Sequence, residues 1–254
     1  MSVAERLPVP NVVLPVAGLA VGIVAWWIAT VLFSLPSYLL PAPDAVVARF
    51  LGNPALYASS AWITLRRALL GGGIGVLAGF LIALVVVQVP LLRRAVVPYL
   101  VAARVVPKLA VAPLLLIYLG TGFTTGAVFV ALITFFPMVV NAVAGLDSVP
   151  RRYHDLFASV DAGVLATFVH LRLPYALPAI FAGLKQSVAL AVVGAVVAEW
   201  VVATNGLGAL VLFALEDVQT DVMFAATVVL FVEGLVLYGV VAAVERRVLW
   251  EAEA

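Results

Sequence analysis

Long apolar runs, separated by short groups of prolines, glycines and charges, make up most of the chain. The first, Val12–Phe33, has 22 residues without a charge, and a bilayer core requires roughly 20. It is longer than the apolar part of a signal peptide, and no small-x-small cleavage site follows it before Leu35, so we expect a retained helix. Five further runs cover about 62–87, 96–119, 127–146, 176–202 and 222–244. The pattern predicts an all-α membrane protein with six transmembrane helices, in a single transmembrane domain over residues 1–254.

The second run contains features of its own. Gly71, Gly75 and Gly79 recur every fourth residue, which puts them on one helix face and lets another helix approach closely. The residues just before them, 61–70, include Trp62 and two arginines, and we expect this part to form an interfacial helix.

Composition narrows the function classes. The chain is 65% hydrophobic and 11% charged, whereas soluble domains are about 25% charged. The net charge of +1 gives no case for nucleic acid as a partner, and the absence of cysteine excludes disulfides, thiolate metal sites and a cysteine nucleophile. No P-loop, H-E-x-x-H or G-x-S-x-G motif occurs, and His154 and His170 lie 16 residues apart. We therefore expect no metal, no cofactor, no catalytic residues and no enzymatic activity.

The distribution of arginines predicts the orientation, because cytoplasmic loops of membrane proteins are enriched in Lys and Arg. With a cytoplasmic N-terminus, Arg49 is left outside and Arg66 and Arg67 lie at an interface. The arginines then inside are Arg6, Arg93, Arg94, Arg151, Arg152, Arg172, Arg246 and Arg247. We expect both termini to be cytoplasmic, together with the loop over 147–175.

That loop contains the most informative motif. Asp155–Pro178 reads D-L-F-A-S-V-D-A-G-V-L-A-T-F-V-H-L-R-L-P-Y-A-L-P, followed by I-F-A-G-L-K after one residue. It resembles the cytoplasmic coupling loop of the binding-protein-dependent transport permeases, the membrane subunits of ABC importers. The family pattern is acidic-Ala-Ala, three residues, Gly-Ala, then about ten residues to Leu-Pro. Here Leu156 and Phe157 replace the alanine pair and Asp161 replaces the glycine, so Gly163 is the alternative position for the usual bend.

The resemblance implies a permease in a prokaryotic inner membrane that couples a solute path to a separate cytoplasmic ATPase. An external solute-binding protein, a second permease copy forming a homodimer, and membrane lipid are the other implied partners. The implied ATPase-coupling residues are Asp155, Leu156, Phe157, Ala158, Asp161, Ala162, Gly163, Leu173 and Pro174. We expect a short helix over Asp155–Asp161, with Ala158 and Ala162 keeping one face small. Pro174 and Pro178 should limit its continuation into the next span.

Three segments suggest the solute. Pro107–Leu114, Phe135–Asn141 and Ala191–Trp200 resemble the nitrate, sulfonate, taurine and pyrimidine or riboflavin branch of the family. The resemblance implies a small polar organic molecule or anion, with a thiamine-precursor pyrimidine or similar heterocycle favoured. A sulfonate, taurine or nitrate permease is the alternative.

Polar groups within the spans are functional candidates, since an unpaired charge at the bilayer centre costs about 2.5–3.5 kcal/mol or more. Lys108, Asn141 and Glu199 are candidates for lining the transport path. Arg104 shares a helix face with Lys108, and Lys108 lies at a depth that would allow pairing with Glu233. A structural ion pair is the plainer interpretation of these charges. An ion-coupled secondary transporter using the two glutamates is the alternative class, and a non-transporting scaffold is the third.

Overall fold

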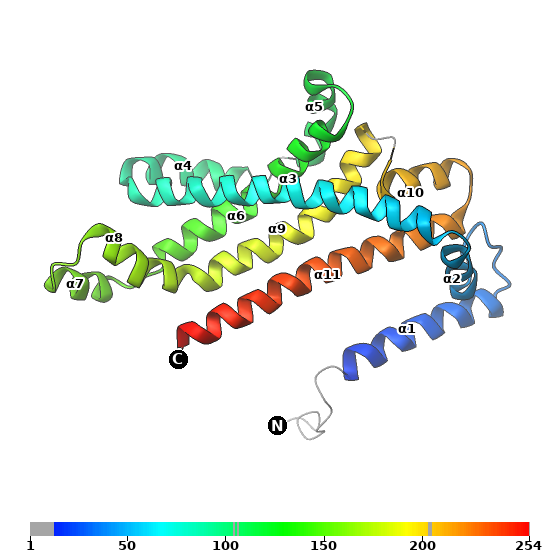
Figure 1. Ribbon diagram of the computed structural model, residues 1–254, viewed down its shortest axis with the longest axis horizontal. Coiled ribbons are helices and arrows are strands. Elements are labelled where there is room, and N and C mark those ends of the chain that lie inside the picture. The colour runs from blue at the N-terminus through cyan, green and yellow to red at the C-terminus, as the bar shows by residue number, and fades with distance from the viewer. Residues whose placement is uncertain (1–12, 104, 106, 203–204, 254) are drawn as a thin grey trace.

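The computed structural model describes residues 13–103, 105, 107–202 and 205–253, and the elements it contains there are all helices. The four longest helices run side by side along the long axis of the molecule (Figure 1). The elements are α1 (Val13–Leu32), α2 (Pro43–Gly52), α3 (Pro54–Gln88), α4 (Pro90–Ala102), η2 (Lys108–Ala110), α5 (Val111–Leu119), α6 (Phe123–Asp147), α7 (Arg151–Ser159), α8 (Val164–Thr167), η3 (Phe168–Arg172), α9 (Leu173–Val202), α10 (Leu207–Glu216) and α11 (Thr220–Glu253).

Five of the described helical segments are long and apolar enough to cross a membrane, which confirms the all-α membrane class. They comprise α1, α3, α6, the stretch from α8 through α9, and α11. The expected run over 96–119 is not one helix, because α4 ends at Ala102 and the chain resumes as η2 and α5. Pro107 precedes η2 and has no backbone N–H to donate to a preceding turn. Two shorter helices thus occupy the place of the third predicted span.

The predicted interfacial helix over 61–70 is wrong. Helix α3 runs without interruption through 35 residues from Pro54 to Gln88, a length of roughly 50 Å at 1.5 Å per residue. The start is set by Asn53, whose side-chain oxygen accepts a hydrogen bond from the Leu56 N–H at 3.3 Å, with Pro54 in the first turn. Arg67 therefore lies inside a long helix.

The glycine row of α3 contacts α6, as the spacing predicted. A Cβ atom at Gly71 would lie 2.5 Å from the Ala127 carbonyl oxygen, and one at Gly79 would lie 2.7 Å from the Phe135 oxygen. At Gly75, between them, a Cβ would collide with the Ala131 carbonyl oxygen of α6. Only residues without side chains permit this backbone approach, so the row determines how α3 and α6 pack.

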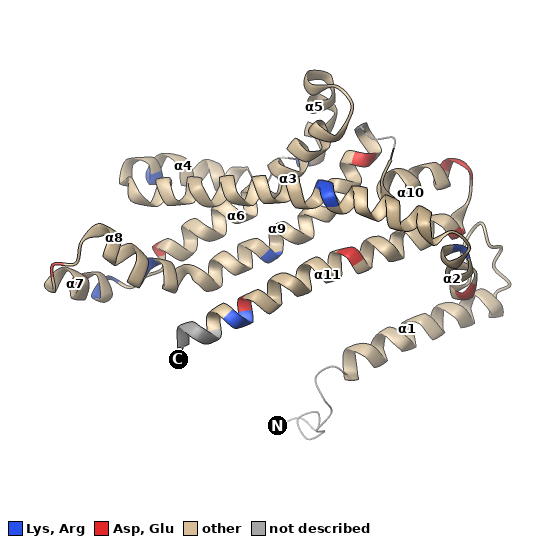
Figure 2. Ribbon diagram, in the orientation of Figure 1, with Lys and Arg blue, Asp and Glu red and all other residues tan. Residues whose placement is uncertain are grey.

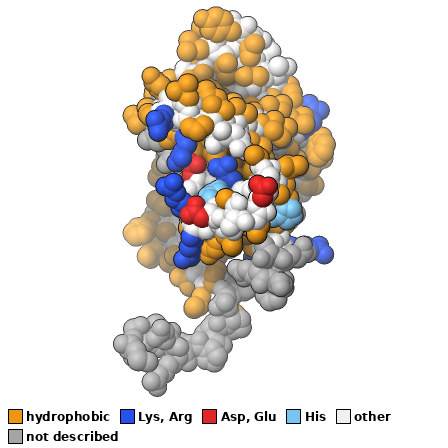
Figure 3. All heavy atoms as spheres, turned by 90° about the vertical axis from the view of Figure 1, so that its left-hand side faces the viewer, with side chains coloured by type: hydrophobic (Ala, Val, Ile, Leu, Met, Phe, Trp, Pro, Cys, Tyr) orange, Lys and Arg blue, Asp and Glu red, His pale blue; other side chains and the backbone are white. Residues whose placement is uncertain are grey.

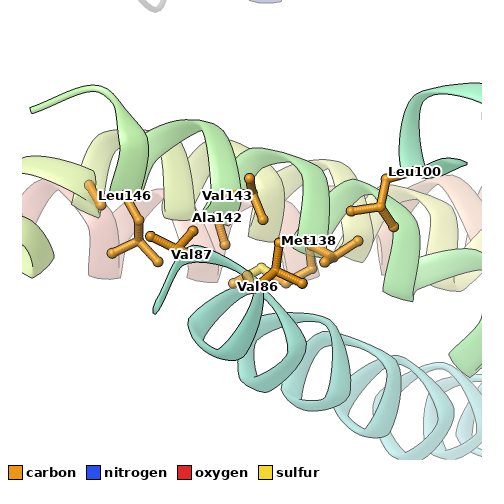
Figure 4. Packing of buried hydrophobic residues seen from close by; sticks show 10 residues of the cluster. Val86, Val87, Leu100, Met138, Ala142, Val143 and Leu146 are labelled. Carbon is orange, nitrogen blue, oxygen red and sulfur yellow. The ribbon is translucent and has the colours of Figure 1, made fainter. Parts of the chain in front are cut away.

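An apolar cluster completes the packing at the end where α3 and α6 terminate (Figure 4). It joins α3, α4, α6 and α9 through Ala83, Val86, Val87, Leu100, Met138, Val139, Ala142, Val143, Leu146 and Ala176. On the other side of α6, the Ser187 hydroxyl donates to the Thr134 carbonyl at 2.9 Å and ties α9 to α6. Helices α3, α6 and α9 consequently form the compact centre of the molecule, while most of α11 faces outward.

The ends of the molecule differ in charge. The end on the left of Figure 1 contains α7, α8, the start of α4 and the ends of α3, α6 and α11. The right-hand end contains α2, α10 and the end of α9. Figure 2 shows basic residues at the start of α4, on α7 and near the end of α11. Among the described residues, the segments that the arginine count predicted to share one side of the membrane therefore lie at the same end of the molecule.

Candidate functional site

The predicted coupling stretch forms two short helices that project from the left-hand end of Figure 1. The first, α7, begins after Pro150 and ends at Ser159, so it starts four residues before the predicted Asp155 and stops two before Asp161. An aromatic contact between Tyr153 and Tyr175, with ring centroids 6.4 Å apart, holds α7 against the start of α9. Every side chain of α7 is at least partly exposed, which leaves this helix free to contact a partner.

The bend between the two helices lies at Asp161, which has a φ of 51°. Aspartate tolerates this left-handed conformation better than most residues, so Asp161 can form the bend at the position where the family pattern has glycine. The turn is closed by the Ala162 N–H, which donates to the Phe157 carbonyl at 3.0 Å. Gly163 has a φ of −62° and only precedes α8, so the alternative that it supplies the bend is wrong. Ala158 and Ala162 lie on opposite sides of the bend and do not share a helix face.

The two prolines do not separate the loop from the next span, which corrects a second expectation. Helix α8 continues through the π-helical turn η3 into α9, and Pro174 and Pro178 lie within α9. The π turn lies directly before Pro174, which has no N–H to donate to the His170 carbonyl, and within it the Leu173 N–H donates five residues back, to the Phe168 carbonyl. π-helical turns often occur at functional sites. Leu173 is thus part of the connection between the projecting helices and α9.

The exposed surface of the two helices includes several large apolar side chains. Val164 and Leu165 of α8 are 78% and 74% exposed, and Leu156 of α7 and Val160 after it are exposed as well. Figure 3, which looks onto this end, shows apolar side chains among basic, acidic and histidine side chains. Val160, Val164 and Leu165 were not among the predicted coupling residues. The signal was present, because these apolar side chains stand within a loop that charge patterning places outside the membrane.

At the opposite end, Glu199 is fully buried and bonded on several sides. Its carboxylate accepts hydrogen bonds from the Arg67 guanidinium, from the Thr64 hydroxyl at 2.9 Å and from the Gly208 N–H at 2.7 Å. The Thr64 hydroxyl in turn accepts from the Leu207 N–H at 2.9 Å. This Glu199 network joins α3, α9 and the N-terminus of α10, where free amides favour an anion. In this conformation Glu199 does not face an open path.

The other polar candidates are placed differently. The Lys108 ammonium lies 5.2 Å from the ring centroid of Phe136, and Asn141 donates to the Pro137 carbonyl at 2.8 Å and to Gln186 at 3.4 Å. The Glu233 oxygens are buried without a hydrogen-bond partner in the described part of the chain. The predicted Lys108–Glu233 pair is therefore wrong. Arg104 lies outside the described residues.

Three further ion pairs connect helices. Lys185 of α9 contacts Glu245 of α11 at 2.7 Å, and Arg93 of α4 contacts Asp147 of α6 at 2.8 Å. At the other end, Arg49 of α2 contacts Asp221 of α11 at 3.4 Å.

These features define a class of protein. Long apolar helices pack around glycines, a mixed-charge helix pair projects at one end, and no group of three metal-ligating side chains occurs in the described residues. The chain is a multi-pass membrane protein whose exposed chemistry suits a protein partner.

Comparisons with known proteins identify the family. Residues 75–250 match the model of the binding-protein-dependent transport system inner membrane component. A probable ABC transporter permease protein of Haemophilus influenzae is 33% identical over 236 residues, covering 93% of this chain and 96% of the relative. The riboflavin transport system permease protein RibX of Chloroflexus aurantiacus is 33% identical over 253 residues, covering 98% and 93%. The formylaminopyrimidine transport permease protein ThiX of Halalkalibacterium halodurans is 35% identical over 186 residues, covering 73% and 74%.

The fold agrees with this result. The crystal structure of an amino acid ABC transporter with histidines has a TM-score of 0.64 and 20% identity, covering 79% of this chain and 97% of that chain. The chain belongs to the family of binding-protein-dependent transport system inner membrane components. It is a permease subunit of an ABC importer in the inner membrane, and the permease is not itself an enzyme. The family implies an ATPase and a solute-binding protein as its partners.

Proposed function

We propose that this permease imports a small flat heterocycle, with a thiamine-precursor pyrimidine as the first choice. The relatives named for riboflavin and formylaminopyrimidine support this choice, because each is at least 33% identical over most of the chain. The taurine transport system permease protein TauC of Escherichia coli, 30% identical over 251 residues, supports a sulfonate as the second candidate. Uptake of labelled formylaminopyrimidine and of taurine by vesicles holding the permease, its ATPase and its solute-binding protein decides between them.

The projecting helices α7 and α8 are the surface that the ATPase contacts in this proposal. The observation that carries it is the exposure of Leu156, Val160, Val164 and Leu165 on a segment continuous with the long helix α9. Exposed apolar side chains rimmed by charges mark a protein interface. The coupling residues predicted from the motif, from Asp155 to Pro174, lie on or beside this surface or in its connection to α9.

The mechanism follows from that continuity. Closure of two ATPase subunits on ATP moves α7 and α8, and the π turn passes this movement into α9. The solute path between two permease copies then opens outward. Both termini and the end with α7 and α8 face the cytoplasm in this arrangement, in agreement with the arginine distribution. Lys108 and Asn141 remain proposed path residues, since both are only partly buried.

Cysteine crosslinking tests the interface, and the cysteine-free chain requires no background removal. We would place single cysteines at Ala158 and at Ala162 and add the purified ATPase subunit. Val47→Cys, exposed on α2 at the opposite end, is the matched control. Crosslinks from Ala158 and Ala162 whose yield changes with ATP are expected, with none from Val47.

The same variants report orientation. A membrane-impermeant maleimide should label Ala158→Cys only from the cytoplasmic side and Val47→Cys only from outside. Labelling of Ala158→Cys from the cytoplasm without any ATPase crosslink would contradict the proposed interface. Labelling from outside would contradict the orientation.

A further inference from the structure

Two amide side chains, Asn141 of α6 and Gln186 of α9, meet where these helices pack side by side (Figure 1). The Asn141 Nδ2 donates to the Pro137 carbonyl at 2.8 Å and to the Gln186 Oε1 at 3.4 Å. The contact depends on Gly183, one turn before Gln186, because a Cβ there would lie only 2.9 Å from the Asn141 Cβ. Gly183 therefore lets α9 approach α6 closely enough for the amides to meet. Gln186 is not among the path residues predicted from the sequence.

Gln186 lies on an exposed face of α9. Ala182 and Ala189, one turn away on either side, and Val193 beyond them are exposed as well. Gln186 is close to the middle of the apolar stretch Val164–Val201, which is long enough to cross a membrane. An amide that faced hydrocarbon at this depth would leave its N–H groups without partners, which is unfavourable. This face is therefore expected to border a water-filled path, and the two alanines leave room beside the amide.

The amide pair leaves one acceptor and one donor free. Both N–H groups of Asn141 are in use, since they donate to Pro137 and Gln186, and this determines the orientation of the Asn141 amide. Its Oδ1 accepts no hydrogen bond from any residue that the structure describes, and the Gln186 Nε2 donates to none of them. The pair thus presents an acceptor next to a donor. A single Asn or Gln amide recognises the N6–N7 edge of adenine with the same pattern.

We propose that Asn141 and Gln186 form the hydrogen-bonding subsite for the solute within the transport path, and that this solute is a flat nitrogen heterocycle. An amino or ring N–H group of the solute donates to the Asn141 Oδ1. The adjacent ring nitrogen or carbonyl oxygen accepts from the Gln186 Nε2. The inference rests on the proposed function and selects between its two candidates. An aminopyrimidine has an amino group beside a ring nitrogen, whereas a sulfonate or nitrate group offers acceptors only and leaves the Asn141 Oδ1 without a donor.

Uptake by vesicles holding the permease, its ATPase and its solute-binding protein tests the subsite, with labelled formylaminopyrimidine as the probe. Gln186→Leu removes the amide, and Gln186→Glu keeps its shape but replaces the donor by an acceptor. Each should lower the maximal uptake rate by about five-fold, the equivalent of about 1 kcal/mol for a two-bond contact. The KM for the solute-loaded binding protein should stay unchanged, because that protein docks outside the membrane. Thr227→Val, which removes a hydroxyl from an exposed position of α11, is the control and should import normally.

A second measurement tests the exposure of this face to water and does not depend on uptake. Gln186→Cys, in the otherwise cysteine-free chain, should react with a water-soluble maleimide, and formylaminopyrimidine with its binding protein should slow the reaction. Ser187→Cys is the matched control, because the neighbouring Ser187 is fully buried and should not react. A purely interhelical role of the amides predicts instead a lowered thermal unfolding midpoint in Gln186→Leu, with normal uptake by the folded fraction.

Three results would overturn the proposal. Normal uptake of formylaminopyrimidine by Gln186→Leu and Gln186→Glu would show that the amides do not bind the solute, while the proposed function would stand. An unreactive Gln186→Cys in the folded transporter would show that lipid or a second copy covers this face. Wild-type uptake of taurine but not of formylaminopyrimidine would refute both the heterocycle and the subsite. The wild-type result thus distinguishes a failure of the proposed function from a failure of the subsite alone.

Discussion

Replacing Glu199 should destabilise the permease more than replacing any exposed charge. The carboxylate is the acceptor for Thr64, Arg67 and the Gly208 N–H, and the Arg67 side chain is only 3% exposed. Glu199→Gln leaves the Arg67 guanidinium buried without a counterion. Breaking a buried pair from one side costs about 3–5 kcal/mol. The loss should also release the N-terminus of α10, because Glu199 and Thr64 accept its first amides.

Denaturation in mixed detergent and SDS micelles, followed by tryptophan fluorescence, measures this free energy of unfolding. Arg66→Gln is the matched control, because Arg66 is the exposed neighbour of Arg67 on the same helix, with its guanidinium carbon 4.6 Å from the Phe123 ring centroid. An exposed cation–π contact contributes about 0.5–1 kcal/mol. The Arg67→Met, Glu199→Gln double variant should be more stable than the sum of the single losses predicts, since it leaves neither charge unpaired.

Two outcomes would refute this reasoning. The first is that Glu199→Gln costs no more stability than Arg66→Gln, and the second is that the losses of the two single variants simply add in the double variant. Solute uptake by the folded fraction distinguishes a structural role of Glu199 from a role in transport. If the role is structural, Glu199→Gln leaves the KM for the solute unchanged. A raised KM at normal stability would return Glu199 to the transport path.

Three further substitutions test other parts of the fold. Gly75→Ala should cost about 1–3 kcal/mol of stability, as overpacking does, because the added Cβ would collide with α6. Gly73→Ala is the control and should cost almost nothing, because no atom lies within 4 Å of the added Cβ. Lys185→Gln should lower the thermal unfolding midpoint, because it removes the contact to Glu245. Exchanging the two charges, with Glu at 185 and Lys at 245, should restore the midpoint. An unchanged midpoint in Lys185→Gln would show that the pair is dispensable. Pro174→Ala supplies the missing N–H, so the π turn should become α-helical and uptake per ATP hydrolysed should fall; normal coupling would show that the turn has no role in transmission.

The apolar spans and the glycine row were predictable because both depend on local sequence. A run of about 20 apolar residues forms a transmembrane helix regardless of its neighbours. Gly71, Gly75 and Gly79 required only that some helix pack on their face. Which helix packs there, α6, is determined by the tertiary structure. The interruption before η2 was harder to predict, because Pro107 is also compatible with a kinked continuous helix.

The pairing of charges was not predictable. Arg67 was expected to reach lipid headgroups, but its partner Glu199 lies 132 positions away along the chain and only the packing of α3 against α9 brings them together. Lys108 and Glu233 were matched by depth alone. Depth does not determine which way a side chain points around the helix axis, and a pair requires both. The bend at Asp161 illustrates a different limit. A search for glycine at positions of positive φ overlooks aspartate, which adopts this conformation less readily than glycine but does so here.

The two ends of α9 differ in how firmly they are held, and this difference determines where the helix can move. Its C-terminal end is fixed by the Glu199 network to α3 and α10, and its middle by Ser187 to α6. Its N-terminal end follows a π turn and contains Pro174, and there the Leu173 N–H donates five residues back instead of four. Displacing the C-terminal end would break a buried ion pair at a cost of several kcal/mol, whereas a register change at the π turn exchanges one backbone hydrogen bond for another. A force applied to α7 and α8 should therefore bend the chain over 168–178 and leave the C-terminal end of α9 in place.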